Sequence, residues 1–318
     1  MFLIFSMLAT HTFDPASVEI HMLEELKAFV AVVDHTSLTK AAERLYLTQS
    51  AVSRRVQQLE EMLGTTLLDR STRPPSVTAV GRRVYQSGAT IIRDLDRLLS
   101  IPKDDEEPSG TFRIGLPQVI ADVALFEIAL RLKTSFPRLA LRCRAEWSTT
   151  LQQAVSNGDL DAAILMLPTG SVPIGGMEAK HIARFDVLIV QSREKPLVPS
   201  QASIAELAEH EWVLNPQGCG YRALLQQAME AVGKQMNLGI DVHGTATQLR
   251  LVAAGMGLGL APRSLLAASS HLSELSVVDV SDFSLVFDLW LAHAKTLGNL
   301  TKALDVLHDA LIDPVQPA

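Results

Sequence analysis

Side chains that can hydrogen-bond to DNA recur along one side of the stretch between residues 49 and 63. With helical spacing they fall on one exposed face, which carries amide, hydroxyl and guanidinium groups from Gln49, Ser50, Ser53, Arg54 and Gln57. Such groups pair with base edges in the major groove and with phosphates. The same spacing is also typical of an ordinary solvated helix face, so the pattern alone leaves both interpretations open.

Three short helices are predicted to position this face. The first has apolar residues at helical spacing from Leu23 to Val33, and Ser37 and Thr48 are suitable N-caps for the second and third. Gly64 is suited to end the third helix. The buried side of that helix is expected to be formed by Val52, Val56, Leu59 and Leu63.

A longer helix is predicted to follow over residues 79–100. One apolar stripe runs along it, made of Val80, Val84, Ile91, Leu95 and Leu98. Such a stripe needs an apolar partner, which is either the helix's own domain or a second subunit.

Residues 101–110 are acidic and proline-flanked, as expected of a hinge. From residue 111 onward, short apolar runs alternate with amphipathic helical stretches. This order predicts an α/β domain with a largely parallel sheet. Its two lobes are expected at about residues 111–178 with 281–318, and at about 179–280.

Four strand-to-helix junctions are the candidate ligand-binding positions, because ligands of open α/β sheets gather beyond the carboxyl ends of the strands. The residues concerned are Pro117, Gln118 and Val119; Ser148 and Thr149; Gln217, Gly218, Cys219, Gly220 and Arg222; and Thr245, Ala246 and Thr247. Plain N-caps at Ser148 and Thr149, a tight turn at the glycines and a solvated Arg222 are the alternatives.

Composition limits the class of protein. The chain has 318 residues, 47% of them hydrophobic, and a net charge of −7, which allows two or three compact domains and argues against a wholly basic nucleic-acid coat. Residues 36–83 nevertheless carry a net charge of +4. The apolar stretch from Met1 to Ala9 lacks the basic segment of a secretory signal and is too short to span a membrane. Residues 1–21 are expected to be an extension outside the fold, with translation starting at Met22.

Two cysteines are too few for a disulfide framework and match no zinc-ligand spacing, so a reducing cytoplasm and no metal or cofactor are expected. An enzyme using Cys219 as nucleophile and His243 as base is one rival interpretation. A cysteine redox switch is another, although Cys143 falls in an apparent strand and is expected to be a buried structural thiol. A periplasmic solute receptor, the third rival, would have no use for the basic segment.

The amino-terminal segment resembles the winged helix-turn-helix of LysR-type transcriptional regulators through LKAFVAV, SLTKAAERL, TQSAVSRRVQQLEEMLG, LLDRSTRP and TAVGRRV. The resemblance implies that Gln49, Ser53 and Arg54 face bases of double-stranded promoter DNA. It further implies that the residues near phosphates or in the wing are Ser37, Thr48, Arg55, Arg73 and Pro74. Ser50 departs from the proline common in the family, yet serine also suits a helix start.

The remainder resembles the LysR-type effector domain, a two-lobed, periplasmic-binding-protein-like α/β fold, through NGDLDAAIL, IAELA and LVAAGMGLGLAPR. The resemblance implies a non-enzymatic regulator with a small-molecule effector between its lobes and an antiparallel pair of linker helices in a dimer. A tetramer of paired dimers would then change DNA bending, and with it the access of RNA polymerase to the promoter, when the effector binds.

Overall fold

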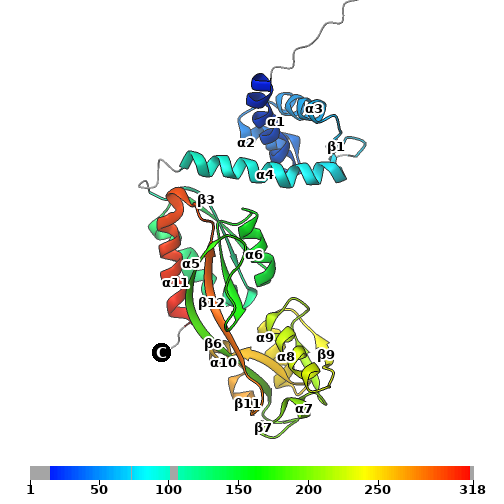
Figure 1. The fold of residues 1–318 in the computed structure, drawn as a ribbon, viewed down its shortest axis with the longest axis vertical. Helices are drawn as coiled ribbons and strands as arrows, with labels where there is room; N and C mark the ends of the chain where they lie inside the picture. The colour runs from blue at the N-terminus through cyan, green and yellow to red at the C-terminus, as the bar shows by residue number, and fades with distance from the viewer. Residues whose placement is uncertain (1–14, 73, 101–106, 316–318) are drawn as a thin grey trace, which may run out of the picture. The chain divides into compact units, whose positions relative to one another are not determined.

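The computed structural model describes residues 15–72, 74–100 and 107–315. The chain divides into two compact units, Met1–Asp96 and Arg97–Ala318 (Figure 1). Within the described residues, no helix combines the length and apolar character needed to cross a membrane.

The amino-terminal unit is built from helices that begin and end where their capping residues stand. Its elements are α1 (Pro15–His35), α2 (Leu38–Leu45), α3 (Gln49–Leu63), β1 (Leu68–Asp69), β2 (Ser76–Val77) and α4 (Ala79–Ser100). Ser37 accepts the Lys40 N–H at 3.3 Å, Thr48 accepts the Ala51 N–H at 3.2 Å, and Gly64 closes α3 with φ +63°. The predicted caps are therefore confirmed.

Helix α1 begins at Pro15, ahead of the start expected at Met22, so residues 15–21 are not an extension outside the helix. The helices α1, α2 and α3 share one core, in which Phe29, Val52, Val56 and Leu59 have no exposed surface. Leu63, expected on the buried side of α3, is instead exposed, because it lies in the last turn next to the capping glycine.

Helix α4 occupies the predicted residues 79–100, but its apolar stripe serves two purposes. Val84 packs against the core of the amino-terminal unit, where Gly88 lets α4 approach Leu26 closely: a Cβ at position 88 would lie 2.6 Å from Leu26 Cδ1. Val80, Ile91 and Leu98 remain 40%, 54% and 60% exposed. Packing on the helix's own domain thus accounts for part of the stripe, and the exposed part is available to contact another surface.

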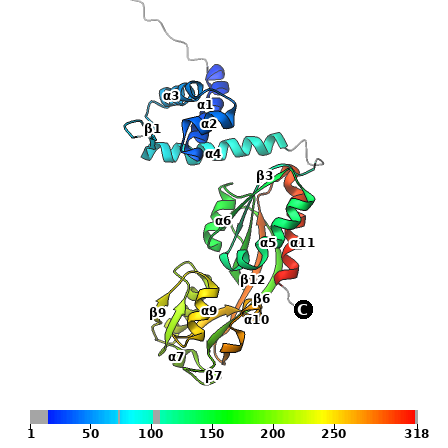
Figure 2. The same cartoon turned by 180° about the vertical axis from the view of Figure 1, so that it is seen from behind.

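The second unit places its helices around one curved sheet with strand order β4-β3-β5-β12-β6-β11-β7, and β10 also pairs with β6 (Figure 2). Its first elements are β3 (Gly110–Leu116), α5 (Gln118–Ser135), β4 (Leu139–Ala145), α6 (Ser148–Ser156), β5 (Ala162–Pro168) and β6 (Glu178–Ser192). Next come β7 (Gln201–Ala202), α7 (Ile204–Leu207), β8 (Glu211–Leu214), α8 (Gly220–Ala231), β9 (Asn237–Asp241) and α9 (Thr245–Ala253). The last are β10 (Gly259–Pro262), α10 (Arg263–Ala268), η2 (Leu272–Glu274), β11 (Leu275–Val280), β12 (Leu285–His293), η3 (Gly298–Leu300) and α11 (Thr301–Val315).

The sheet is mixed, so the expectation of a largely parallel sheet is wrong. Parallel pairs join β3 to β4 and to β5, and β8 to β9 in a separate two-stranded sheet. Strand β6 carries the chain from the first lobe to the second and β12 brings it back. Because the chain runs in opposite directions in these two long strands, they pair antiparallel. Strand β6 also pairs antiparallel with β10 and β11.

Two lobes with separate cores result. The first core surrounds Ile114, Ile128, Leu289 and Leu307, whereas the second surrounds Trp212, Leu225, Leu258 and Phe287. The change between cores falls inside the crossover strands, since Ala183 belongs to the first core and Val187 to the second. The lobe boundaries expected at 178 and 281 are therefore displaced into β6 and β12.

Candidate functional site

Helix α3 presents the predicted polar face to solvent. Gln49, Ser50, Arg54 and Gln57 are exposed, and Thr48 Oγ1 lies 3.0 Å from Ser50 Oγ at the start of the helix. Because the first turn is capped by Thr48, the serine at position 50 leaves the helix start intact. The exposed side chains of Gln49, Arg54 and Gln57 are available to hydrogen-bond to an external partner.

Two predicted contact residues of α3 are less exposed. The Arg55 guanidinium donates to Glu24 Oε2 on α1 at 3.1 Å, so the phosphate contact implied for Arg55 competes with an internal ion pair. A hydrogen bond from Lys27 is the main cause that lowers the pKa of Glu24 and keeps this acceptor charged. Ser53 is half-buried and lines a hollow of about 240 Å³ together with Arg70 and Thr72 of the wing.

The wing is held to α3 by a buried carboxylate that the sequence analysis did not single out. Glu60 Oε1 accepts the N–H groups of Leu67 and Leu68 at 2.8 and 3.0 Å, and Glu60 Oε2 lies 2.9 Å from Arg70 Nη2. Strands β1 and β2 then pair antiparallel. Of the predicted wing residues, Pro74 is exposed and Arg73 lies outside the described residues.

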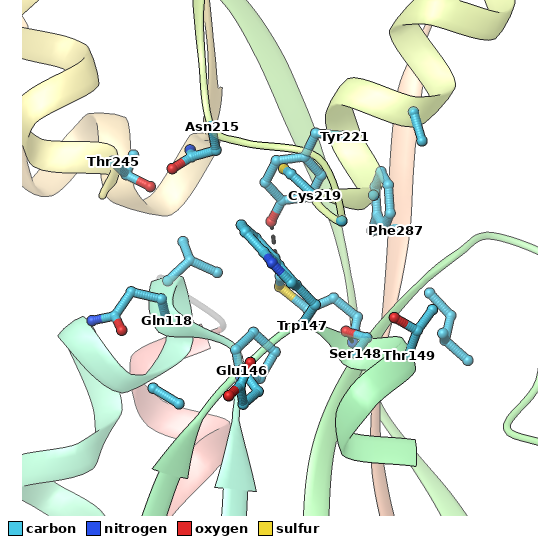
Figure 3. A pocket seen from close by; sticks show the side chains of 18 of the residues that line it. Gln118, Glu146, Trp147, Ser148, Thr149, Asn215, Cys219, Tyr221, Thr245 and Phe287 are labelled. Atoms are coloured by element: carbon cyan, nitrogen blue, oxygen red, sulfur yellow. Dashed lines mark hydrogen bonds between the residues drawn. The ribbon is translucent and has the colours of Figure 1, made fainter. Parts of the chain in front are cut away.

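A cavity of about 700 Å³ lies between the two lobes of the second unit. All four predicted junctions contribute to it, through Pro117, Gln118, Val119, Ser148, Thr149, Gly218, Cys219, Gly220 and Thr245. Figure 3 shows Gln118, Ser148 and Thr149 on the first-lobe side and Asn215 and Thr245 opposite them. The cavity therefore lies at the strand ends where ligand-binding residues were expected.

Four predicted residues do not line the cavity: Gln217, Arg222, Ala246 and Thr247. Arg222, in the first turn of α8, is buried, and its guanidinium donates to Asn215 O at 3.2 Å and to Asp241 Oδ2 at 3.1 Å. The solvated alternative for Arg222 is therefore wrong, and these bonds engage its guanidinium inside the second lobe.

The N-cap alternative for Ser148 and Thr149 is also wrong. Helix α6 has Trp147 as its N-cap residue, without a side-chain hydrogen bond, and Ser148 Oγ instead accepts the Met166 N–H at 3.0 Å. This bond ties the start of α6 to strand β5. Thr149 is exposed and lines the cavity, so the start of α6, whose first backbone amides have no partner in a preceding turn, lies at the cavity wall.

Aromatic residues that the sequence analysis missed form the inner wall. The rings of Tyr221 and Phe287 meet edge to face with centroids 4.8 Å apart, and Tyr221 Oη donates to Met166 Sδ of the other lobe at 3.3 Å (Figure 3). The Trp147 indole lies against the backbone of Gly218, where φ is +100° and a Cβ would come within 2.7 Å of the ring. The lobes are thus in direct contact across the cavity floor.

The Cys219 thiol does not suit the rival enzyme chemistry, and Cys143 is not the buried structural thiol that was expected. Cys219 and His243 both line the cavity, but burial is the largest influence on the Cys219 thiol and raises its pKa, which is opposite to the activation a nucleophile needs. Cys143 is exposed on the edge strand β4 rather than buried, because the second half of this strand has no covering layer.

The arrangement defines a class of protein: a winged helix-turn-helix unit followed by a two-lobed small-molecule receptor. Residues 23–82 match the family model described as bacterial regulatory helix-turn-helix protein, lysR family, and residues 105–313 match the LysR substrate binding domain. The chain belongs to the LysR family of transcriptional regulators.

Individual relatives agree with this assignment. The chain is 32% identical over 261 residues to the HTH-type transcriptional regulator CzcR of Bacillus anthracis, covering 80% of this chain and 84% of the relative. A full-length cysteine-to-aspartate variant of OxyR from Pseudomonas aeruginosa has a similar fold, with a TM-score of 0.70 at 18% identity over 91% of this chain and 94% of that one. CbnR, whose structure was determined with its target DNA, gives a TM-score of 0.61 at 18% identity over 91% and 98%.

Proposed function

We propose that this regulator binds promoter DNA through the exposed face of α3 and the wing, and that an effector in the interlobe cavity changes the outcome of that binding. One observation carries the proposal: the starts of α5, α6, α8 and α9 and three aromatic rings converge on a single cavity made by both lobes. A molecule that touches both lobes stabilises one lobe arrangement over others, and this differential affinity is what an allosteric signal requires.

In this proposal the protein acts as a receptor rather than an enzyme. Burial raises the pKa of the Cys219 thiol, which argues against its use as a nucleophile. As a reader of chromosomal DNA it works in the cytoplasm. No metal or cofactor enters the proposed mechanism.

Replacing Thr149 by alanine is expected to weaken effector binding about three- to tenfold, the effect of losing one hydrogen bond. The free energy of unfolding should change by less than about 0.5 kcal/mol, because Thr149 is exposed and caps no helix. Isothermal titration and thermal unfolding measure the two quantities. Thr150→Ala, one residue further along α6 and outside the cavity lining, is the matched control. Equal affinities for both variants would remove Thr149 from the site.

We further propose that α4 pairs with its copy in a dimer through the exposed part of its stripe, and that dimers pair again through the second unit. On α5, Val123, Phe126 and Leu130 are 37%, 79% and 51% exposed at helical spacing beside the free edge strand β4. Exposed apolar stripes of this kind are typical of subunit contacts.

Replacing Ile91 by aspartate should weaken the dimer at least tenfold, because the pairing would bury an unpaired charge. Sedimentation velocity at micromolar concentration is the measurement. Gln86→Asp adds the same charge at an exposed polar position of the same helix and is expected to leave the assembly unchanged. An Ile91→Asp protein with the parental sedimentation coefficient would rule out this face as the contact.

A further inference from the structure

Carboxylates outnumber basic groups in the lining of the interlobe cavity. Among the described residues that line it, the carboxylates are Asp122 and Glu146, the basic side chain is the His243 imidazole, and neither lysine nor arginine contributes. The nearby Arg222 does not line the cavity, because its guanidinium is directed at Asn215 O and Asp241. A ligand carrying only negative charge would therefore sit beside two carboxylates, with no lysine or arginine of the described lining to balance it.

Glu146 is placed to receive a cation. Its backbone N–H donates to Leu116 O at 3.2 Å, which fixes it at the carboxyl ends of β3 and β4. Its carboxylate is partly exposed, and its ion pair with Arg144 is 3.8 Å long, beyond hydrogen-bonding distance. Asp122, by contrast, already accepts a hydrogen bond from Gln118 Nε2 at 2.7 Å. Glu146 is thus the carboxylate with free acceptor capacity.

Hydrogen-bond donors lie within two residues of this acceptor. Helix α6 starts at Ser148 without a side-chain cap, and the Ser148 oxygen is engaged by the Met166 N–H, so the first backbone amides of α6 need an external acceptor. An acceptor for a cation and donors for an anion are therefore adjacent in the chain, separated by Trp147 alone. A ligand that satisfies both must carry its cationic and anionic groups close together.

The inner part of the wall is largely apolar. It is formed by Trp147, Tyr221, Phe287 and Met166, whereas Asn215, His243 and Thr245 add polar groups from the second lobe. The aromatic faces favour an ammonium group as well as an apolar body. Figure 3 shows the Trp147 ring in the middle of the cavity wall, between Ser148 and Tyr221. The whole cavity, of about 700 Å³, is large enough for an amino acid with a side chain the size of phenylalanine or leucine.

We infer that the effector is an α-amino acid with a large apolar side chain. Its ammonium group pairs with Glu146, its carboxylate accepts from the first amides of α6 and the Thr149 hydroxyl, and its side chain lies against Trp147 and Phe287. An α-amino acid matches because both charged groups are attached to the same carbon atom. The inference rests on the proposed effector role of this cavity.

Matched probes on the full-length chain test it. In the aromatic series all three probes carry a phenyl group on a short alkyl chain: L-phenylalanine has both the ammonium and the carboxylate, phenethylamine has the ammonium alone, and 3-phenylpropanoate has the carboxylate alone. The aliphatic series repeats this design with L-leucine, isopentylamine and 4-methylpentanoate. Thermal unfolding and titration calorimetry should show tightest binding by an amino acid, weaker binding by its amine and weakest binding by its acid.

The variant Glu146→Gln should lose at least tenfold in affinity for the amino acid and leave the acid unweakened. Glu209→Gln, which removes the same charge at an exposed position of the second lobe, should change neither. Any of three results would overturn the inference. The acids could bind as tightly as the amino acids, Glu146→Gln could leave the amino-acid affinity unaltered, or neither amino acid could bind at millimolar concentration. Tight acid binding that is lost in Thr149→Ala would keep the cavity as the effector site, whereas failure of the proposed function would appear as DNA binding that no cavity ligand alters.

Discussion

Replacing Arg54 by alanine is expected to weaken binding to the specific promoter site by roughly 1 to 3 kcal/mol, about five- to 150-fold, if the guanidinium reads a base edge. Arg54 is exposed on α3 next to the capped first turn and, unlike Arg55, makes no ion pair with another described residue. Competition binding with specific and scrambled duplexes at fixed salt concentration separates the two components of affinity.

The control for this result removes the same charge elsewhere. Arg138 is exposed in the second unit, where it pairs with Glu107, so Arg138→Ala should leave specific binding within twofold. An Arg54→Ala protein that loses the same factor on every sequence would show that Arg54 contacts phosphates rather than bases.

Replacing Glu60 by alanine should destabilise the amino-terminal unit by about 3 kcal/mol. The substitution leaves the buried N–H groups of Leu67 and Leu68 without an acceptor, and each such group costs about 1 to 3 kcal/mol. It also frees the wing from the end of α3, so DNA affinity should fall together with stability. Urea unfolding of the full-length chain, followed by a fluorophore attached to the amino-terminal unit, gives the free energy.

Glu60→Gln is the matched control because its amide oxygen can still accept those two bonds. It loses mainly the ion pair with Arg70, whose side chain is 46% exposed, so the expected loss is below about 1 kcal/mol. Equal destabilisation by alanine and glutamine would mean that the charge, rather than the two backbone acceptor bonds, holds the wing.

Features set by local sequence were predictable. Ser37, Thr48 and Gly64 act on the nearest backbone groups, so their cap roles depended on no distant residue. The strand-end argument was equally successful for the cavity, since the direction of β3 and β4 places Gln118 and Thr149 at the same edge of the sheet. These conclusions rest on chain geometry alone.

Features set by packing between distant segments were missed. Phe287 reaches the cavity because β12 returns from the second lobe, and Trp147 takes its place through a contact with Gly218, which is distant in the sequence. Arg222 was misjudged for the same reason, because its partner Asp241 comes from β9. The exposure of Cys143 follows from β4 being an edge strand, which periodicity cannot indicate.

A DNase I footprint of the full-length chain on DNA upstream of its own gene, with and without a ligand found to bind the interlobe cavity, tests the central claim most directly. The account predicts a sequence-specific protected region whose extent or pattern of enhanced cleavage changes when the ligand saturates the cavity. Thr149→Ala should keep the protection and lose the change at the same ligand concentration. A footprint that saturating ligand leaves unaltered, or the absence of sequence-specific protection, would contradict it.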